Sequence, residues 1–217
     1  MASWFAYVPR HVAEDLLQFP DASPIRREAR FNAVALFADV SGFTPMSEAL
    51  GKTGRVGTEE LTAILNRYFD PMIELIHSYG GIIGKFGGDA MTVLFPYSDD
   101  TQSVVVRRAI QCALLMQERM VNYKGIDTSA GRFDLAMKAG LAMGSIFTTT
   151  VGDPDLRLET IIAGQTLDLC SDAEHKANPG EVVVHNPMLA VAGQIEIGDE
   201  RGDFSLVTGL AEPEASV

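Results

Sequence analysis

The stretch that decides the fold is FNAVALFADVSGFT, residues Phe31–Thr44. Its apolar run, Val34–Ala38, consists of residue types that suit a buried strand. The run stops at Asp39, and Ser41–Gly42 then turns the chain toward a short expected helix over Pro45–Leu50. An acid at the end of a buried strand, before a glycine turn, is how α/β folds present a carboxylate to a ligand. The alternative, which this stretch alone leaves open, is that Asp39 only caps the next segment.

A second acid follows at the same kind of position. Residues Ile82–Phe95, IIGKFGGDAMTVLF, predict a strand, a glycine turn and another strand, with Asp89 on the turn. Two strand-end acids on neighbouring strands can share a hard divalent cation, because Mg²⁺ is commonly held by one or two carboxylates together with phosphates and water. The pair Asp39 and Asp89, fifty positions apart, therefore predicts a metal site.

The composition sets limits on what the chain does. Its 217 residues, 47% of them hydrophobic, are enough for one large domain or two small ones. The net charge of −12 argues against nucleic acid and anionic membrane surfaces as partners, and a triphosphate would need a metal or local cations to bind. Two cysteines, Cys112 and Cys170, indicate buried thiols in a reducing, cytoplasmic setting. No apolar run reaches the ~18 residues of a membrane span, and Met1–Trp4 does not begin a signal peptide.

The rest of the chain predicts alternating helices and strands. Apolar residues at helical spacing predict a long helix from Thr58 to Gly80, after a flexible loop over Gly51–Gly57. The later expected elements are a helix from Asp99 to Tyr123, a polar loop over 124–132, strands over 133–150 and 158–162, a helix over 165–177, a strand over 181–185 and two short strands around 201–203. The order βαββαβ, with further αβ elements, indicates an α+β sandwich of ferredoxin-like type whose helices cover one sheet face.

The motifs FADVSGFT and KFGGDAM together resemble the catalytic domain of class III nucleotidyl cyclases, the adenylyl and guanylyl cyclases. The chain is most similar to the first catalytic half of the bicarbonate-responsive soluble adenylyl cyclases, and the resemblance covers nearly its whole length. It implies the same fold, and formation of 3′,5′-cyclic AMP and pyrophosphate from ATP. The glycines before Asp89 also resemble the GGDEF signature of diguanylate cyclases, but Ala90 stands where that signature has an acid.

The resemblance divides the chain into three parts. Residues 1–30 are expected to be a lead-in that packs on the domain. Residues 31–211 are expected to be the cyclase catalytic domain, and residues 212–217 a tail or the start of a linker.

The resemblance also implies a set of metal and phosphate ligands. In the family two ions, Mg²⁺ or Mn²⁺, are held by two carboxylates, which match Asp39 and Asp89, and by a backbone carbonyl, which falls at Val40. One ion lowers the pKa of the ribose 3′-hydroxyl, and the other neutralises the leaving phosphates. The turn residues expected to offer backbone N–H groups to the phosphates are Ser41, Gly42, Phe43 and Thr44.

The family completes its site with residues of a partner subunit, across a head-to-tail dimer. Lys85 matches a lysine that reads the purine, although a solvated lysine is an open alternative. The other matching positions are degenerate: Ile161 stands for an acid that reads the base, Asp168 for an asparagine, Asp172 for an arginine and Thr208 for a triphosphate-binding lysine. For Asp168 and Asp172 a solvated helix face is the simpler interpretation.

Two functions remain open from the sequence. One is the metal- and triphosphate-binding half of an adenylyl cyclase, which requires a complementary catalytic domain in cis or in trans. The other is a degenerate module that dimerises, as a possible homodimer, and holds nucleotide or an anion without turnover. Lys85 would then be a base or anion contact, but the arginine that helps soluble cyclases bind bicarbonate falls at Ser171. The preference for ATP over GTP is implied by the resemblance alone.

Overall fold

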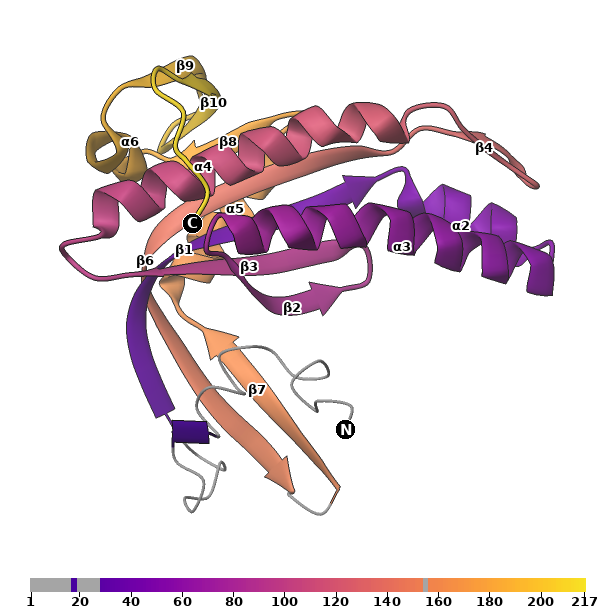
Figure 1. Cartoon of the computed structure of the whole chain (residues 1–217), viewed down its shortest axis with the longest axis horizontal. Coiled ribbons are helices and arrows are strands. Elements are labelled where there is room, and N and C mark those ends of the chain that lie inside the picture. The colour runs from indigo at the N-terminus through magenta and orange to yellow at the C-terminus, as the bar shows by residue number, and fades with distance from the viewer. Residues whose placement is uncertain (1–16, 19–27, 154–155) are drawn as a thin grey trace.

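Figure 1 presents the computed structural model of the chain, which describes residues 17–18, 28–153 and 156–217. The strands are β1 (Glu28–Ser41), β2 (Ile82–Gly87), β3 (Ala90–Tyr97), β4 (Ile126–Thr128), β5 (Gly131–Phe133), β6 (Ala136–Asp153), β7 (Arg157–Ala163), β8 (Val182–His185), β9 (Ile195–Glu200) and β10 (Phe204–Leu210). The helices are α2 (Phe43–Gly51), α3 (Arg55–Ser78), α4 (Gln102–Arg119), α5 (Gln165–Lys176) and α6 (Pro187–Ala192), with a 3₁₀ turn over Met120–Tyr123 after α4.

Strand β1 lies inside the main sheet and pairs antiparallel with β3 on one side and β6 on the other. The sheet order is β2-β3-β1-β6-β8-β10-β9, and β7 pairs with β6 as a ribbon that extends away from the sheet (Figure 1). The first four strands in this order, with α3 and α4 between them in sequence, form the ferredoxin-like βαββαβ unit. The predicted α+β fold with additional C-terminal elements is therefore confirmed.

The expectation that the helices cover one face of the sheet is wrong, because α5 lies on the other face. Side chains alternate along β1: Val34, Leu36 and Ala38 belong to the core under α3 and α4, whereas Ala33 and Ala35 pack with α5 residues such as Cys170. Strand β8 runs parallel to β6, so the chain between them must cross over the sheet, and this connection carries α5.

The long helix begins at Arg55 rather than at the predicted Thr58. The residue before it is Gly54, with a φ of 74°, and the Thr58 hydroxyl donates to the Gly54 carbonyl at 3.2 Å from inside the helix. Threonine is a residue type that commonly caps helices, but the Thr58 hydroxyl instead donates a hydrogen bond to a backbone carbonyl of the preceding turn. The connection between α2 and α3 is therefore residues 52–54, which is shorter than the predicted loop over 51–57.

The predicted polar loop over 124–132 contains the hairpin of β4 and β5. Side-chain hydrogen bonds close its turn: the Thr128 hydroxyl donates to the Gly131 carbonyl at 2.7 Å and accepts from the Ala130 N–H at 3.2 Å. Helix α6 was also not predicted from the sequence. Both elements are too short for a hydrophobic period to reveal them.

The segment expected as a tail, residues 212–217, is held against the ends of α3 and α4. The Arg107 side chain pairs with the Glu214 carboxylate and donates to the Glu212 carbonyl at 2.6 Å, and the Val217 N–H donates to the Ser78 carbonyl at 2.7 Å. Most of the expected lead-in, residues 1–30, lies outside the described residues. Within the described ranges, no helix is long and apolar enough to cross a membrane.

Helix α5 lies directly against the backbone of β6 at Gly140. A Cβ atom at this position would lie 2.2 Å from the Glu174 nitrogen and 2.5 Å from the Cys170 carbonyl oxygen. The Cys170 thiol also donates to the Gly140 carbonyl at 3.1 Å. Burial raises the pKa of this thiol, so it stays protonated and acts as a donor.

We expect Gly140→Ala to lower the free energy of unfolding by about 1–3 kcal/mol, because the backbone of a packed helix must move to admit the methyl group. Urea denaturation measures this loss. Gly51→Ala is the matched control, since a Cβ at Gly51 meets no atom within 4 Å. An unfolding midpoint that Gly140→Ala leaves unchanged would contradict the close packing of α5 on β6.

Candidate functional site

The two acids predicted from the sequence lie at the same end of the sheet. Asp39 is near the carboxyl end of β1, and Asp89 is on the turn between β2 and β3, after Gly88 with a φ of 71°. Strand β3 pairs with β1 so that Met91 lies opposite Ala38, which brings this turn beside Asp39. The negative charge of Asp89 acts on Asp39 and raises its pKa. The fold thus brings together carboxylates that are fifty positions apart in the sequence.

Asp39 occupies an environment that disfavours its negative charge. Burial is the largest cause of its raised pKa, followed by the charges of Asp89 and Glu174, whereas the Lys138 and His175 cations lower the pKa. A bound cation relieves this kind of repulsion, so the carboxylate pair fits a divalent metal. In the part of the chain that the structure describes, no three His, Cys, Asp or Glu side chains converge on one point. The other ligands of a metal at this pair would therefore be backbone oxygen, phosphate and water.

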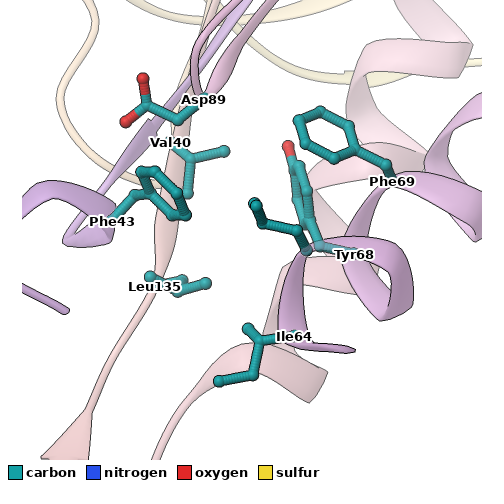
Figure 2. A pocket seen from close by; sticks show the side chains of 8 residues that line it. Val40, Phe43, Ile64, Tyr68, Phe69, Asp89 and Leu135 are labelled. Carbon is teal, nitrogen blue, oxygen red and sulfur yellow. The ribbon is translucent and has the colours of Figure 1, made fainter. Parts of the chain in front are cut away.

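An apolar floor supports the strand end that carries Asp39. Figure 2 shows a small pocket below Val40, with Tyr68 and Phe69 of α3 on one side and the Asp89 carboxylate at the rim, turned away from the rings. The full lining is Val40, Phe43, Ile64, Leu65, Tyr68, Phe69, Asp89 and Leu135, and the cavity of about 10 Å³ has room for one water molecule. Burial is the main cause of a raised pKa at Tyr68, so its hydroxyl stays protonated beside the two acids.

The expected phosphate-binding turn leads into the N-terminus of α2. Gly42 has a φ of 92°, and a Cβ there would lie 2.3 Å from the Asp134 carbonyl oxygen, so only glycine fits. Because the residue before the helix is a glycine, no side chain at that position caps the first turn of α2. Backbone N–H groups of Phe43 and Thr44 thus begin a helix N-terminus without a side-chain cap.

Lys85 and Ile161 lie on segments that the fold brings together. Lys85 is exposed on β2, and Ile161 is exposed on β7. The residue after Ile161 contacts β2, because a Cβ at Gly84 would meet the Ile162 side chain at 2.8 Å.

The remaining degenerate positions are all on the surface. Asp168 and Asp172 are exposed, one turn apart on α5. Thr208 is exposed on β10, two strands beyond β6, where its hydroxyl donates to the Glu196 carbonyl at 3.2 Å. Thr208 is therefore the residue of this set farthest along the sheet from β1.

The sequence analysis did not single out two charged residues beside Asp39. Lys138 lies opposite Asp39 in the pairing of β6 with β1, and its ammonium lies 2.6 Å from the Glu174 carboxylate of α5. A lysine between Met137 and Ala139, on a strand whose neighbours are buried, is the signal that could have drawn attention to it.

Asp39→Asn is expected to stabilise the metal-free chain at neutral pH. Because the pKa of Asp39 is raised, the folded chain binds this proton more tightly than the unfolded chain, and stability falls as pH rises from 3.8 through the raised pKa. The penalty is fully present above that range, and the asparagine removes it. Thermal melts in EDTA measure the gain, which should shrink as pH is lowered toward 3.8. Asp203→Asn, at an exposed position between β9 and β10, should change the melting temperature little. A melting temperature at neutral pH that is lower in Asp39→Asn than in the wild type would refute the repulsion.

Comparison with known proteins gives several relatives. The chain is 31% identical over 173 residues to adenylate cyclase type 10 of Oryctolagus cuniculus, which covers 78% of this chain and 10% of that protein. It is 29% identical over 147 residues to adenylate cyclase 1 of Rhizobium meliloti, covering 67% of this chain and 21% of the relative. The chain thus spans about a tenth to a fifth of the length of these curated relatives.

Solved structures of cyclase domains are also similar to this chain. The crystal structure of the guanylyl cyclase Cya2 superposes with a TM-score of 0.68 at 26% identity, covering 87% of this chain and 98% of that one. The family model for the adenylate and guanylate cyclase catalytic domain matches residues 27–211. The chain therefore belongs to the adenylate and guanylate cyclase catalytic domain family.

Proposed function

We propose that this chain is the metal- and triphosphate-binding half of an adenylyl cyclase, which forms 3′,5′-cyclic AMP and pyrophosphate from ATP with a complementary catalytic domain. The observation that carries the proposal is the pair Asp39 and Asp89, which β1 and the β2–β3 turn hold at one end of the sheet. ATP is chosen over GTP because the relatives in rabbit and Rhizobium are adenylate cyclases.

Each residue near the pair has a role in this proposal. The Asp39 and Asp89 carboxylates and the Val40 carbonyl would hold two Mg²⁺ or Mn²⁺ ions. Such ions activate a hydroxyl nucleophile and neutralise the charge of a leaving phosphate. The N–H groups of the turn over Ser41–Thr44, at the N-terminus of α2, would bind the β- and γ-phosphates. The apolar side chains under Val40 pack against the face of the strand end opposite Asp39.

The need for a partner follows from residues at the matching positions. Asp172 is exposed where the family has an arginine, and a carboxylate repels a phosphoryl group instead of stabilising it. Asp168, when ionised, cannot donate a hydrogen bond as an asparagine does, and Thr208 carries no charge. Exposed apolar side chains lie on the two segments that the fold brings together here, since Phe86 of β2 is 47% exposed and Ile161 of β7 is 43% exposed. Such a surface suits a partner domain, or a second copy of the chain in a homodimer.

The second candidate function is a binding module without turnover. The degenerate positions Ile161, Asp172 and Thr208 favour it, because a homodimer of this chain would lack the complementary charges in both sites. Lys85 would then contact the base or an anion. The two candidates share the metal site and differ in whether a complementary domain restores catalysis.

From the proposed metal site we predict that Mg²⁺ or Mn²⁺ together with a nonhydrolysable ATP analogue raises the melting temperature of the chain. Ligands that bind only the folded state stabilise that state. Asp39→Asn and Asp89→Asn should each abolish this rise. Asp203→Asn, at an exposed acid between β9 and β10, is the matched control and should keep it. A full ligand-induced rise in both site variants would exclude these carboxylates as ligands.

Because the residues of the complementary half-site are replaced in this chain, we predict that the isolated chain makes little or no cyclic AMP. One preorganised group that stabilises developing charge is worth about 10²–10³ in rate, and an arginine at a phosphoryl transition state about 10³–10⁵. A second cyclase domain that carries the asparagine, arginine and lysine, with its own metal acids removed, should restore turnover when mixed with this chain. That turnover should disappear with Asp39→Asn. Failure of several such domains to restore cyclic AMP formation would favour the binding module.

A further inference from the structure

Asp39 and Lys138 face the same side of the sheet. They lie directly opposite each other in the antiparallel pairing of β1 with β6. Residues paired in this way project to one face, with Cβ atoms roughly 4.5–5.5 Å apart. This face is the one that α5 covers, since Ala33 and Ala35 of β1 pack with Cys170 there. A lysine with a flexible four-carbon stem can therefore reach the Asp39 carboxylate.

Lys138 is nevertheless paired with a different acid. Its ammonium lies 2.6 Å from the Glu174 carboxylate, and among the described residues Glu174 is the acid within ion-pair distance of Lys138. Glu174 is only 8% exposed, so its charge needs this partner. Lys138 is still near enough to Asp39 for its charge to lower the pKa of that carboxyl.

The position of Glu174 is fixed by the packing of α5. The helix contacts the β6 backbone at Gly140, two residues after Lys138, where the Glu174 nitrogen leaves no room for a Cβ. Cys170, one turn earlier, is fully buried and donates to the Gly140 carbonyl. The packing therefore fixes the backbone of Glu174 relative to Lys138, so that only its side chain is free to adjust if the lysine turns toward Asp39.

We propose that Glu174 retains the Lys138 ammonium and so keeps the Asp39 carboxylate free for a divalent cation. The inference rests on the metal site proposed above. A lysine bound directly to Asp39 would occupy the oxygen atoms that the metal needs, and its charge would repel the metal. Held by Glu174, the same lysine offsets part of the repulsion between Asp39 and Asp89 without occupying either carboxylate. Glu174 and Lys138 are positioning residues that act through Asp39.

The test measures Mn²⁺ affinity of the whole 217-residue chain, with and without a nonhydrolysable ATP analogue, from the electron paramagnetic resonance signal of free Mn²⁺. Glu174→Gln keeps the shape of the side chain and releases Lys138 to Asp39. It should weaken Mn²⁺ binding by roughly three- to tenfold, the range expected for a partly buried ion pair that must be broken. The double variant Lys138→Met with Glu174→Gln removes the competing lysine and should return the affinity to the wild-type value or above.

The control is a matched ion pair away from the metal site. Glu181 and Arg201 are also 2.6 Å apart and partly buried, and this pairing lowers the pKa of Glu181 to about 2. Glu181→Gln should lower stability and leave Mn²⁺ affinity unchanged. If Glu174→Gln fails to fold, Lys138→Met alone replaces it as the test variant. This variant lacks the competing lysine and should bind Mn²⁺ at least as tightly as the wild type, so weaker binding would overturn the inference.

The outcomes separate this inference from the metal site. A wild-type chain that binds no Mn²⁺ overturns both proposals. Wild-type binding that Glu174→Gln leaves unchanged overturns the inference alone. Equal weakening in the single and the double variant also overturns it, because Glu174 would then act through structure and not through Lys138. The charges of Glu174 and Lys138 also act on Asp39 from a distance, and the loss of either charge alone would change Mn²⁺ affinity by a similar factor in opposite directions. Recovery in the double variant therefore supports the inference when Glu174→Gln weakens Mn²⁺ binding by a larger factor than Lys138→Met strengthens it, and equal factors overturn it.

Discussion

The antiparallel pairing of β1 with β3 and β6 is the constraint on which the rest of the structure depends. Side chains alternate along β1, so one face buries Val34 and Leu36 under α3 and α4, and the other places Ala33 and Ala35 under α5. The same alternation puts Asp39 on the α5 face and Val40 on the α3 face. A register shift of one residue would exchange these faces and bury the carboxylate in the main core. The pairing therefore fixes both the hydrophobic core and the direction of Asp39, the acid proposed to bind metal.

The candidate site lowers the stability of the fold that holds it. Burial and the nearby Asp89 charge disfavour ionised Asp39, yet β1 holds it there through pairing on both sides. Sites whose charges repel in the free protein are typical of places where a ligand supplies the opposite charge. A cation bound at the proposed site would return the free energy lost to repulsion and would thereby stabilise the folded chain.

Much of the fold and the centre of the site could be predicted from the sequence. The strand that carries Asp39 and the hairpin that carries Asp89 have strong local signals, namely a buried apolar run and a glycine turn. Other features depend on tertiary contacts. The face on which α5 lies is set by the crossover to β8. The start of α3 at Arg55 is instead a local feature, set by the turn at Gly54, which the cap-forming residue type at Thr58 obscured. The Lys138–Glu174 ion pair joins positions 36 residues apart on a strand and a helix, and no local pattern connects them.

Helix α5 carries two sets of residues with different tasks. Cys170 and Glu174, one turn apart, are buried against β6, whereas Asp168 and Asp172, also one turn apart, are exposed. The buried set contacts Lys138, the residue opposite Asp39 on β6, and the exposed set stands at positions that the proposal assigns to the other half of the site. Because both sets belong to one helix of 12 residues, the α5 backbone joins the exposed positions to the ion pair beside Asp39. The close contact of this backbone with Gly140 therefore positions the residues of both sets relative to β6.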